Sequence, residues 1–323
     1  MHKRIIRKYY KFIFKKQDVA ARLDNYLIDK LPKRYTRNII QKIIILGNVY
    51  INKKQIKNKK HLLKSKDRIE IFTLYLNKKE AILKCERLNL SILYEDEYLL
   101  IINKQFNLVV HPGTRNQEGT LLNGIKYLLE NKAETRIQLK KPYIANRIDK
   151  ETSGLIMVAT DEKIVQNLSK QFSLNWIKKK YIAVVNGIIK EEQINKISKI
   201  VISRKKGKSR KKVCFSTFKV IERLRDLTVL KCIISSGRTH QIRVHLKELG
   251  YTIFNEKKYS IDKIYYEKIA SYKKKIISRI IQDSKFLALH AKSLELIHPI
   301  FLKYLQFTSI IPFEIYMLIK IMF

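Results

Sequence analysis

A short charged segment that leads into an apolar stretch carries the first candidate for chemistry. It reads Asn146-Arg147-Ile148-Asp149-Lys150-Glu151-Thr152-Ser153-Gly154-Leu155, and the residues that follow predict an apolar strand over 154–159. Asp149 would then lie at the rigid edge of that strand, where neighbouring cations can keep a carboxylate ionised as a nucleophile or general base. A structural carboxylate in a turn would have the same local sequence, so both interpretations stay open.

A second segment gathers basic and polar side chains at the start of a predicted helix. It reads Gly237-Arg238-Thr239-His240-Gln241-Ile242-Arg243-Val244-His245-Leu246. Gly237 permits a turn and Thr239 can cap the helix, so that His240 and Arg243 project from neighbouring helical faces. A helix with a purely structural role is the alternative. His240 and His245 lack the i, i+4 spacing of metal ligands, so no metal site is predicted.

The elements around these segments predict an α+β fold. Apolar runs at 98–103, 154–159, 181–185, 227–234 and 287–296 predict strands, and helical spacing predicts helices near 120–129, 164–172 and 239–249. Strands dominate and the helices do not alternate with them, which favours a mixed, mainly antiparallel sheet with flanking helices. We assign this domain to residues 90–323. The basic run 204–212 is expected to be an exposed loop.

A smaller α/β module precedes it. Helical spacing over 23–31 stops at Pro32, and a second helix can begin after Thr36 and end at Gly47. A strand at 49–51, a turn at 52–54 and a later strand around 69–71 follow. We assign residues 1–19 to an N-terminal extension, 20–76 to this module and 77–89 to a linker. One face would gather Arg34, Arg37, Lys42, Lys53, Lys54 and Lys57, which suits a phosphate backbone, although an ordinary solvated surface is the alternative.

The charge balance of the chain also points to a polyanionic partner. Its 323 residues include 68 Lys and Arg against 28 Asp and Glu, a net charge of +40. Compositional drift in an A+T-rich genome is the other explanation for that excess. The three cysteines are widely spaced, which argues against a disulfide framework and a cysteine zinc site. No signal-peptide core or bilayer-length apolar segment is found, so a cytoplasmic protein is expected.

The motifs of both regions resemble those of known families. Residues 22–27 (RLDNYL), 47–53 (GNVYINK) and 66–69 (KDRI) resemble the S-four RNA-binding domain, which adds Arg22 to the expected RNA-binding residues. Residues 146–155 and 237–246 are similar to two motifs of the RluA/RluD family of RNA pseudouridine synthases. Residues 179–187 resemble that family's tyrosine motif, 289–291 with 298–299 its closing strand, and 110–113 the RluD branch. The motifs occur in family order.

This resemblance implies a role for each matching residue. Asp149 matches the catalytic aspartate, Arg243 the arginine paired to it, and Tyr181 the tyrosine that packs on the uracil. Arg147 matches the arginine that helps to expel the uridine from its stack, and Leu289 matches an apolar pocket wall. Arg238 and His240 are assigned to substrate binding with them. The family requires no metal and no organic cofactor. Two positions depart from its pattern: Asn146 replaces a histidine, and residues 255–260 (NEKKYS) replace a Gly-Asp-x-x-Tyr-Gly stretch.

The resemblance thus implies an isomerase that converts uridine to pseudouridine in ribosomal RNA, with the large-subunit (23S) RNA as the expected substrate. The expected partner is ribosomal RNA or a pre-ribosomal particle, without a membrane or obligatory protein partner, and the protein is expected to be a monomer. A non-catalytic RNA-binding or ribosome-assembly factor that kept the fold is the rival. A DNA-binding regulator would need a helix-turn-helix signal, which the sequence lacks.

Overall fold

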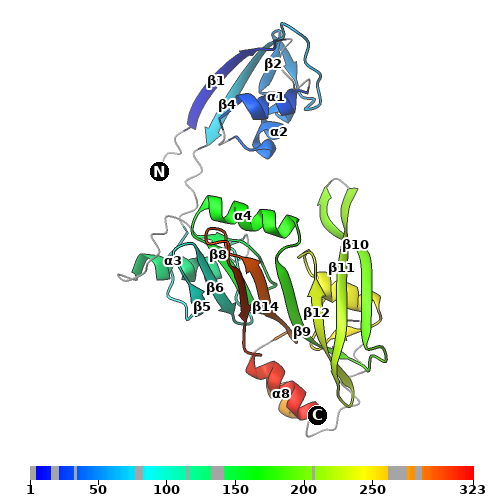
Figure 1. The fold of residues 1–323 in the computed structure, drawn as a ribbon. Helices are drawn as coiled ribbons and strands as arrows, with labels where there is room; N and C mark the ends of the chain where they lie inside the picture. The colour runs from blue at the N-terminus through cyan, green and yellow to red at the C-terminus, as the bar shows by residue number, and fades with distance from the viewer. Residues whose placement is uncertain are drawn as a thin grey trace. The chain divides into compact units, whose positions relative to one another are not determined.

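The computed structural model describes residues 5–15, 22–32, 35–76, 83–113, 116–131, 142–205, 208–260, 275–280 and 286–323, with the backbone alone for 5–8, 74–76, 202–205 and 208–210. The chain divides into two compact units, Met1–Ile82 and Leu83–Phe323, each of which has its own hydrophobic core. Figure 1 shows the elements of both.

The N-terminal unit packs two helices on a four-stranded antiparallel sheet. Its elements are β1 (Ile5–Ile13), α1 (Leu23–Lys30), α2 (Arg37–Ile45), β2 (Val49–Ile51), β3 (Lys54–Ile56) and β4 (Arg68–Leu76), with strand order β1-β4-β2-β3. Helix α1 ends before Pro32, because a proline cannot continue the backbone hydrogen bonds. Gly47 ends the α2 segment with φ of +78°, a conformation that favours glycine. Both helices therefore lie where the apolar spacing predicts them.

Strand β1 is an element that the sequence analysis did not predict. Residues 1–19 were expected to form an extension, yet Ile5–Ile13 pairs antiparallel with β4 along its whole length, from Ile5 opposite Leu76 to Ile13 opposite Arg68. Tyr10 and Phe12 pack against the core of this unit, and Phe14 is buried in it. The basic residues that interrupt the apolar pattern had obscured the alternation that a one-sided strand requires.

The second unit, Leu83–Phe323, is built on one large sheet. Its strands are β5 (Ser91–Glu95), β6 (Leu99–Lys104), β7 (Tyr143–Ile144), β8 (Ser153–Ala159), β9 (Lys178–Asn186), β10 (Gln193–Lys205), β11 (Lys208–Arg223), β12 (Leu227–Ile234), β13 (Thr252–Ile253), β14 (Leu289–Ile297) and β15 (Tyr304–Thr308). The order is β10-β11-β12-β9-β14-β8-β6-β5, with β13 beside β9, β15 beside β14 and β7 beside β8. The β14–β8 pair is parallel and the other described pairs are antiparallel, as the fold class predicts.

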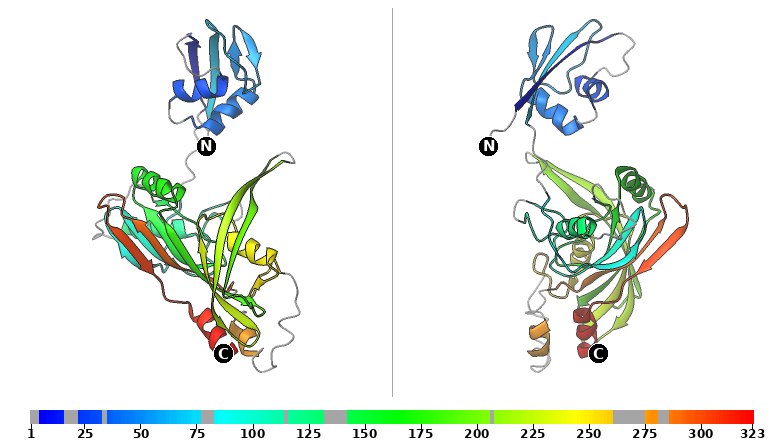
Figure 2. Two further views of the ribbon diagram at one scale, coloured as in Figure 1. Left: turned by 45° about the vertical axis from the view of Figure 1, so that its right-hand side comes forward. Right: turned by 90° about the vertical axis from the view of Figure 1, so that its left-hand side faces the viewer.

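The strands of the sheet's centre are buried on both faces. Along β6, Leu100 and Ile102 belong to one core cluster, while Leu99 and Ile101 belong to another on the opposite face. Helices α3 (Leu121–Asn131), α5 (Gln241–Glu248) and α8 (Phe313–Met322) contribute to the first cluster, and α4 (Glu162–Ser173) contributes to the second. Burial on both faces explains why these strands are continuous apolar runs in the sequence. Figure 2 shows the same sheet from two further sides.

The basic segment 204–212 differs from its prediction as an exposed loop. Strand β10 continues to Lys205 and β11 begins at Lys208, so the described residues of this run belong to two paired antiparallel strands (Figure 1). A run of charged residues has no alternation of apolar and polar side chains from which a strand could be predicted. Here the pairing of β10 with β11 gives the backbone its extended conformation. Among the described residues, no helix is long and apolar enough to cross a membrane.

Candidate active site

Asp149 lies in the loop that joins β7 to β8, and two contacts with β14 fix the start of β8. Gly154 has φ of +113°, and a Cβ built on it would lie 2.4 Å from the carbonyl oxygen of Ala291. Position 154 therefore has to be glycine for the two backbones to approach this closely. One residue earlier, Ser153 shares a hydrogen bond of 2.8 Å with His290 Nδ1. Asp149 is thus positioned by two strands rather than by its own loop alone.

Arg243 holds the Asp149 carboxylate in place. It projects from α5 with a side chain that is 3 % exposed, and its Nη1 donates to Asp149 Oδ2 at 3.0 Å. The same guanidinium donates to Glu256 through Nε at 2.6 Å and through Nη2 at 2.7 Å. Glu151 Oε2 lies 3.4 Å from Nη2. Nε and Nη2 together engage Glu256, Nη2 also reaches Glu151, and Nη1 donates to Asp149.

Glu256 is a functional residue that the sequence reasoning missed. Burial by itself would raise its pKa, but the hydrogen bonds and charge of Arg243, with the backbone N–H groups of Lys258 and Tyr259, lower it below its usual value. Glu256 is therefore the anion that compensates the buried Arg243. It lies in the stretch 255–260 that departs from the family pattern, at the position of the usual aspartate. That correspondence was the signal that could have identified it.

His240 approaches the other oxygen of Asp149. Its Nε2 lies 3.5 Å from Asp149 Oδ1, and its Nδ1 shares a hydrogen bond of 2.9 Å with the Tyr259 hydroxyl. Burial lowers the pKa of His240, an effect that the charge of Asp149 opposes in part. The helix starts one residue later than predicted. His240, with φ of +56°, rather than Thr239, occupies the N-cap position of α5, and its side chain makes no capping hydrogen bond.

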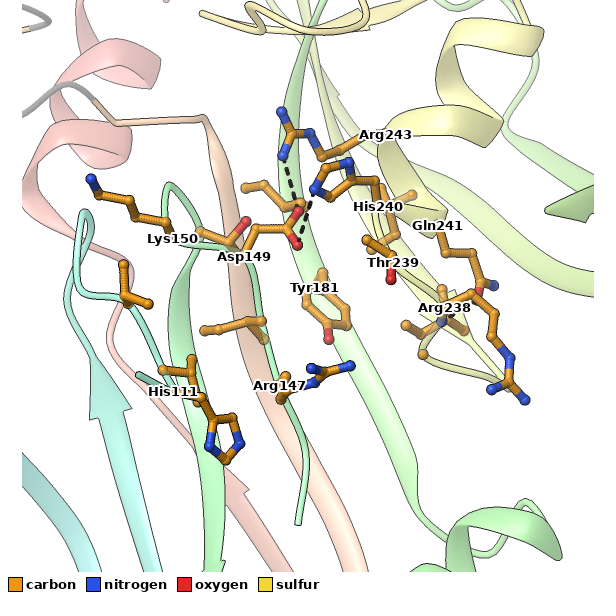
Figure 3. Close-up of a pocket in the computed structure, with 18 residues that line it drawn as sticks. His111, Arg147, Asp149, Lys150, Tyr181, Arg238, Thr239, His240, Gln241 and Arg243 are labelled. Atoms are coloured by element: carbon orange, nitrogen blue, oxygen red, sulfur yellow. Dashed lines mark hydrogen bonds and ion pairs between the residues drawn. The ribbon is translucent and has the colours of Figure 1, made fainter. Parts of the chain in front are cut away.

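Tyr181 supplies an aromatic wall beside this cluster. It lies on β9 and is 8 % exposed. Burial and, next, the charge of Asp149 raise the pKa of its phenol well above the usual value, so it stays protonated. Figure 3 shows Arg243 and His240 converging on the Asp149 carboxylate, with the Tyr181 ring close by. A planar ring next to an anchored carboxylate is a suitable wall for a nucleobase.

Asp149, Tyr181, His240 and Arg243 line one pocket of about 320 Å³. All seven residues that the sequence analysis assigned to catalysis and substrate binding contribute to it: Arg147, Asp149, Tyr181, Arg238, His240, Arg243 and Leu289. His111 also lines the pocket, and burial followed by the charge of Arg147 lowers its pKa. It had been noted only as part of a motif. The volume suits a ligand the size of a nucleobase rather than a large cofactor.

Lys104 is a further residue near the site that the sequence reasoning did not single out. It ends β6 and is 1 % exposed, and its Nζ donates to the carbonyl oxygens of Gln105 at 2.8 Å and Lys150 at 3.2 Å. Burial lowers the pKa of Lys104 to about 7, although the nearby charge of Asp149 opposes this shift. Because it holds the Lys150 carbonyl, Lys104 supports the turn that carries Asp149.

Asn146 does not line the pocket. Its Oδ1 accepts the backbone N–H of Met157 at 2.7 Å, and its Nδ2 donates to the carbonyl oxygen of Leu155 at 3.3 Å. Both partners belong to β8. The side chain therefore holds the loop against the strand. No group of three or more His, Cys, Asp or Glu in the described ranges could hold a metal ion.

The expected RNA-binding residues lie in the N-terminal unit. Lys42, Lys53 and Lys54 are exposed on α2 and the β2–β3 hairpin. Arg22 instead donates two hydrogen bonds to Asp24, and Arg37 Nη2 donates to Asn25. Arg34 lies outside the described residues. Arg22 and Arg37 therefore make contacts within the fold, while Lys42, Lys53 and Lys54 are available to a partner.

Comparison with known proteins agrees with this geometry. The family model described as RNA pseudouridylate synthase matches residues 98–248, and the S4 domain model matches residues 21–69. Ribosomal large subunit pseudouridine synthase C of Buchnera aphidicola subsp. Baizongia pistaciae is 34% identical over 86% of both chains. Synthase D of the same organism is 30% identical over 93% of both chains, and that of the subspecies Schizaphis graminum is 33% identical over 91% of both chains.

Solved structures show the same fold. Human RNA pseudouridylate synthase domain containing 4 superposes with a TM-score of 0.57 at 21% identity, over 72% of this chain and 92% of that one. The human domain-containing 1 protein gives 0.51 at 20% identity, over 70% and 84%. With the sequence relatives and the ordered motifs, these likenesses lead to one conclusion: the chain belongs to the RNA pseudouridine synthase family of isomerases and carries an N-terminal S4 domain.

Proposed function

We propose that this protein converts uridine to pseudouridine in ribosomal RNA, with the large-subunit 23S RNA as substrate and Asp149 as the essential group. The observation that carries the proposal is the Asp149 carboxylate, which is held by Arg243 at 3.0 Å and lies beside Tyr181 in a pocket of nucleobase size. The relatives named large-subunit synthases C and D support this choice of RNA.

The reaction requires the base to be detached and re-attached through another ring atom. The bond from ribose C1′ to uracil N1 breaks, a bond from C1′ to C5 forms, C5 loses its proton and N1 gains one, so atoms and charge balance. Asp149 acts in this sequence as nucleophile or general base, and the guanidinium of Arg243 keeps it ionised. Because the glycosidic bond is not accessible in a stacked helix, the uridine has to be flipped out first.

The other pocket residues then have separate tasks. The Tyr181 ring stacks on the flipped uracil, which contributes about 1–3 kcal/mol for a base on an aromatic side chain. Arg147 and Arg238, at the pocket, contact the RNA, and Leu289 supplies an apolar wall. The exposed lysines of the S4 domain bind phosphates outside the pocket. We further propose that the protein acts as a monomer in the cytoplasm, on free ribosomal RNA or a pre-ribosomal particle.

Pseudouridine mapping tests the proposal directly. Ribosomal RNA from cells with and without the protein is compared, and unmodified 23S transcript is treated with the purified protein. At least one pseudouridine of the large-subunit RNA should depend on the protein in both experiments. An Asp149→Asn variant is the control. If no site changes in cells and the transcript stays unmodified, the protein is not a ribosomal RNA synthase, and the non-catalytic alternative gains support.

A further inference from the structure

The face of the sheet opposite the pocket carries a second, positively charged hollow. Side chains alternate along a strand, so on β9 Tyr181 faces the pocket while Lys180 and Ile182 face the reverse side. There a hollow of about 290 Å³ is lined by Tyr181 and Ile182 of β9 together with three lysines and three uncharged polar residues: Lys180, Lys231, Lys292, Ser293, Gln306 and Thr308. Apart from Tyr181, which lines both, no residue of the proposed reaction contributes to this hollow.

Strand pairing brings these residues together from four neighbouring strands. On β9, Lys180 lies opposite Ser293 of β14, and Ser293 lies opposite Thr308 of β15. On the other side of β9, Ile182 lies opposite Lys231 of β12. Neighbouring strands are ~4.8 Å apart, so the three lysines and the hydroxyl groups share one small area of a rigid sheet. A hollow built on paired strands has a defined shape.

The lysines of the hollow are incompletely neutralised. Lys180 forms an ion pair with Glu295, and Lys292 Nζ donates to the carbonyl oxygen of Ser309. Across the part of the chain that the structure describes, neither Lys231 nor Lys292 lies within ion-pair distance of a carboxylate. Lys219 of β11 lies directly opposite Lys231 and also has no such partner there. Like charges directly opposite each other destabilise a sheet, so this pairing costs stability unless an anion joins it.

We propose that this hollow binds backbone phosphates of the substrate RNA, in a segment distant from the target uridine. The inference rests on the proposed function, because a folded ribosomal RNA can present phosphates to both faces of the sheet, whereas the few nucleotides around the flipped base occupy one face. Lysine ammonium groups and Ser, Thr and Gln side chains are ordinary phosphate contacts. The chain also carries an N-terminal S4 domain with exposed lysines, so RNA fits better than an acidic protein.

The experiment compares two RNAs and three double variants. Lys231→Ala with Lys292→Ala removes two charges from the hollow, and Lys231→Arg with Lys292→Arg keeps both. The matched control is Lys163→Ala with Lys170→Ala on α4, where two exposed lysines have no carboxylate partner among the described residues. Affinity is measured against salt concentration, first for unmodified transcribed 23S RNA and then for a short stem-loop that contains the modified uridine.

The alanine pair in the hollow should weaken binding of the long RNA and lower its slope of log affinity against log salt by ~0.7–0.9 for each lysine. The arginine pair and the α4 control should keep the wild-type slope, and the stem-loop should bind all variants alike. A wild-type slope for the alanine pair, an equal loss in the α4 control, or an equal loss on the stem-loop overturns the proposal. Wild-type turnover of the long RNA is measured in parallel, because its absence would contradict the proposed function instead.

Discussion

Two aspartates in the two units show how the same ion pair can serve structure or chemistry. In the S4 domain, Asp24 is 0 % exposed, and Arg22 donates to both of its oxygens, at 3.0 and 2.9 Å. Gln41 adds a third hydrogen bond at 3.2 Å. In the second unit, Asp149 is 23 % exposed and accepts one N–H from Arg243, while Oδ1 lies 3.5 Å from His240, at the outer limit of a hydrogen bond.

The difference lies in where the arginine directs its paired N–H groups. Arg22 gives two N–H groups to Asp24 itself, whereas Arg243 gives two to Glu256 and one to Asp149. Asp24 accepts three hydrogen bonds and is fully buried, so a substrate cannot reach the acceptor site that remains on it. The cost of burying Arg243 is thus offset by Glu256, which leaves one side of Asp149 available to the pocket. Geometry, rather than residue type, separates the two roles.

The largest effect is expected from Asp149→Asn. Asparagine keeps the volume but cannot act as a nucleophile or base at neutral pH, so single-turnover pseudouridine formation should fall on the order of 10²–10⁴-fold or more. RNA affinity should stay close to wild type. Residual turnover within tenfold of wild type would show that Asp149 is not the catalytic group. Asp149 and Asp24 would then not differ in function.

Glu256→Gln should have the next largest effect. Glutamine keeps the shape but leaves the buried guanidinium without its compensating charge, so Arg243 loses its fixed direction toward Asp149. A misplaced group of this kind costs about 10²-fold in turnover. The measurement is single-turnover kinetics at saturating RNA, with Glu248→Gln at the exposed end of α5 as control. Glu256→Asp should recover part of the rate, and a Glu256→Gln enzyme with wild-type turnover would show that Arg243 is positioned otherwise.

Arg243→Lys tests whether the geometry of the guanidinium, and not only its charge, positions Asp149. A lysine keeps the charge but cannot reach Glu256 with two N–H groups and Asp149 with a third. Turnover should therefore fall nearly as far as in Arg243→Ala. The two variants are compared in one assay with thermal unfolding of each. Full activity in Arg243→Ala would mean that Asp149 needs no cation beside it.

Two variants of Tyr181 should distinguish stacking on its ring from hydrogen bonding by its hydroxyl. Their effect on turnover should be smaller than that of the Arg243 variants. Tyr181→Phe keeps the ring, so RNA affinity should survive even if turnover falls. Tyr181→Leu loses the ring as well, which should weaken binding by about 1–3 kcal/mol. Affinities are measured on a catalytically inactive Asp149→Asn background to avoid turnover. An equal loss of affinity in both variants would argue against stacking on this ring.

Asp24 should affect stability and not chemistry. Burial alone would raise its pKa, but hydrogen bonds and charge from Arg22, then Gln41 and Arg37, lower it below the ordinary value. A lowered folded pKa contributes stability above the unfolded pKa of ~3.9, and that contribution is lost as the pH falls through the folded value. Asp24→Asn should therefore lower the stability of the S4 domain at pH 7 by about 1–3 kcal/mol and flatten this acid dependence.

Amide hydrogen exchange, measured on the full chain, reports the stability of the S4 domain separately from that of the second unit. In the Asp24→Asn variant, exchange should become faster in the S4 domain only. Turnover at saturating RNA provides the contrast with Asp149→Asn. A drop in turnover as large as that of Asp149→Asn, without a change in exchange, would contradict the structural role of Asp24.

Much of this arrangement follows from local patterns, while the rest depends on long-range pairing. Apolar runs predict β6, β8, β9, β12 and β14, and the ordered motifs predict which residues line the pocket, because both signals are contained in short segments. Strand β1 was missed because basic residues interrupt its alternation and its partner β4 lies far along the chain. The tasks of Glu256 and Lys104 depend on burial next to Arg243 and the Asp149 turn, which local spacing does not encode; for Glu256 only the match to the family aspartate could have indicated it.

The close contact of Gly154 with Ala291 has a consequence for the order of events during synthesis. Strand β14 supplies the backbone against which the Asp149 loop is set, and it also pairs with β9, which carries Tyr181. Because β14 leaves the ribosome long after both of its partners, the motif residues emerge early but cannot take up their working positions until β14 docks. Domains generally fold as units during translation, with the N-terminal one first. A nascent chain stalled before residue 289 would thus present a folded S4 domain joined to a second unit without activity.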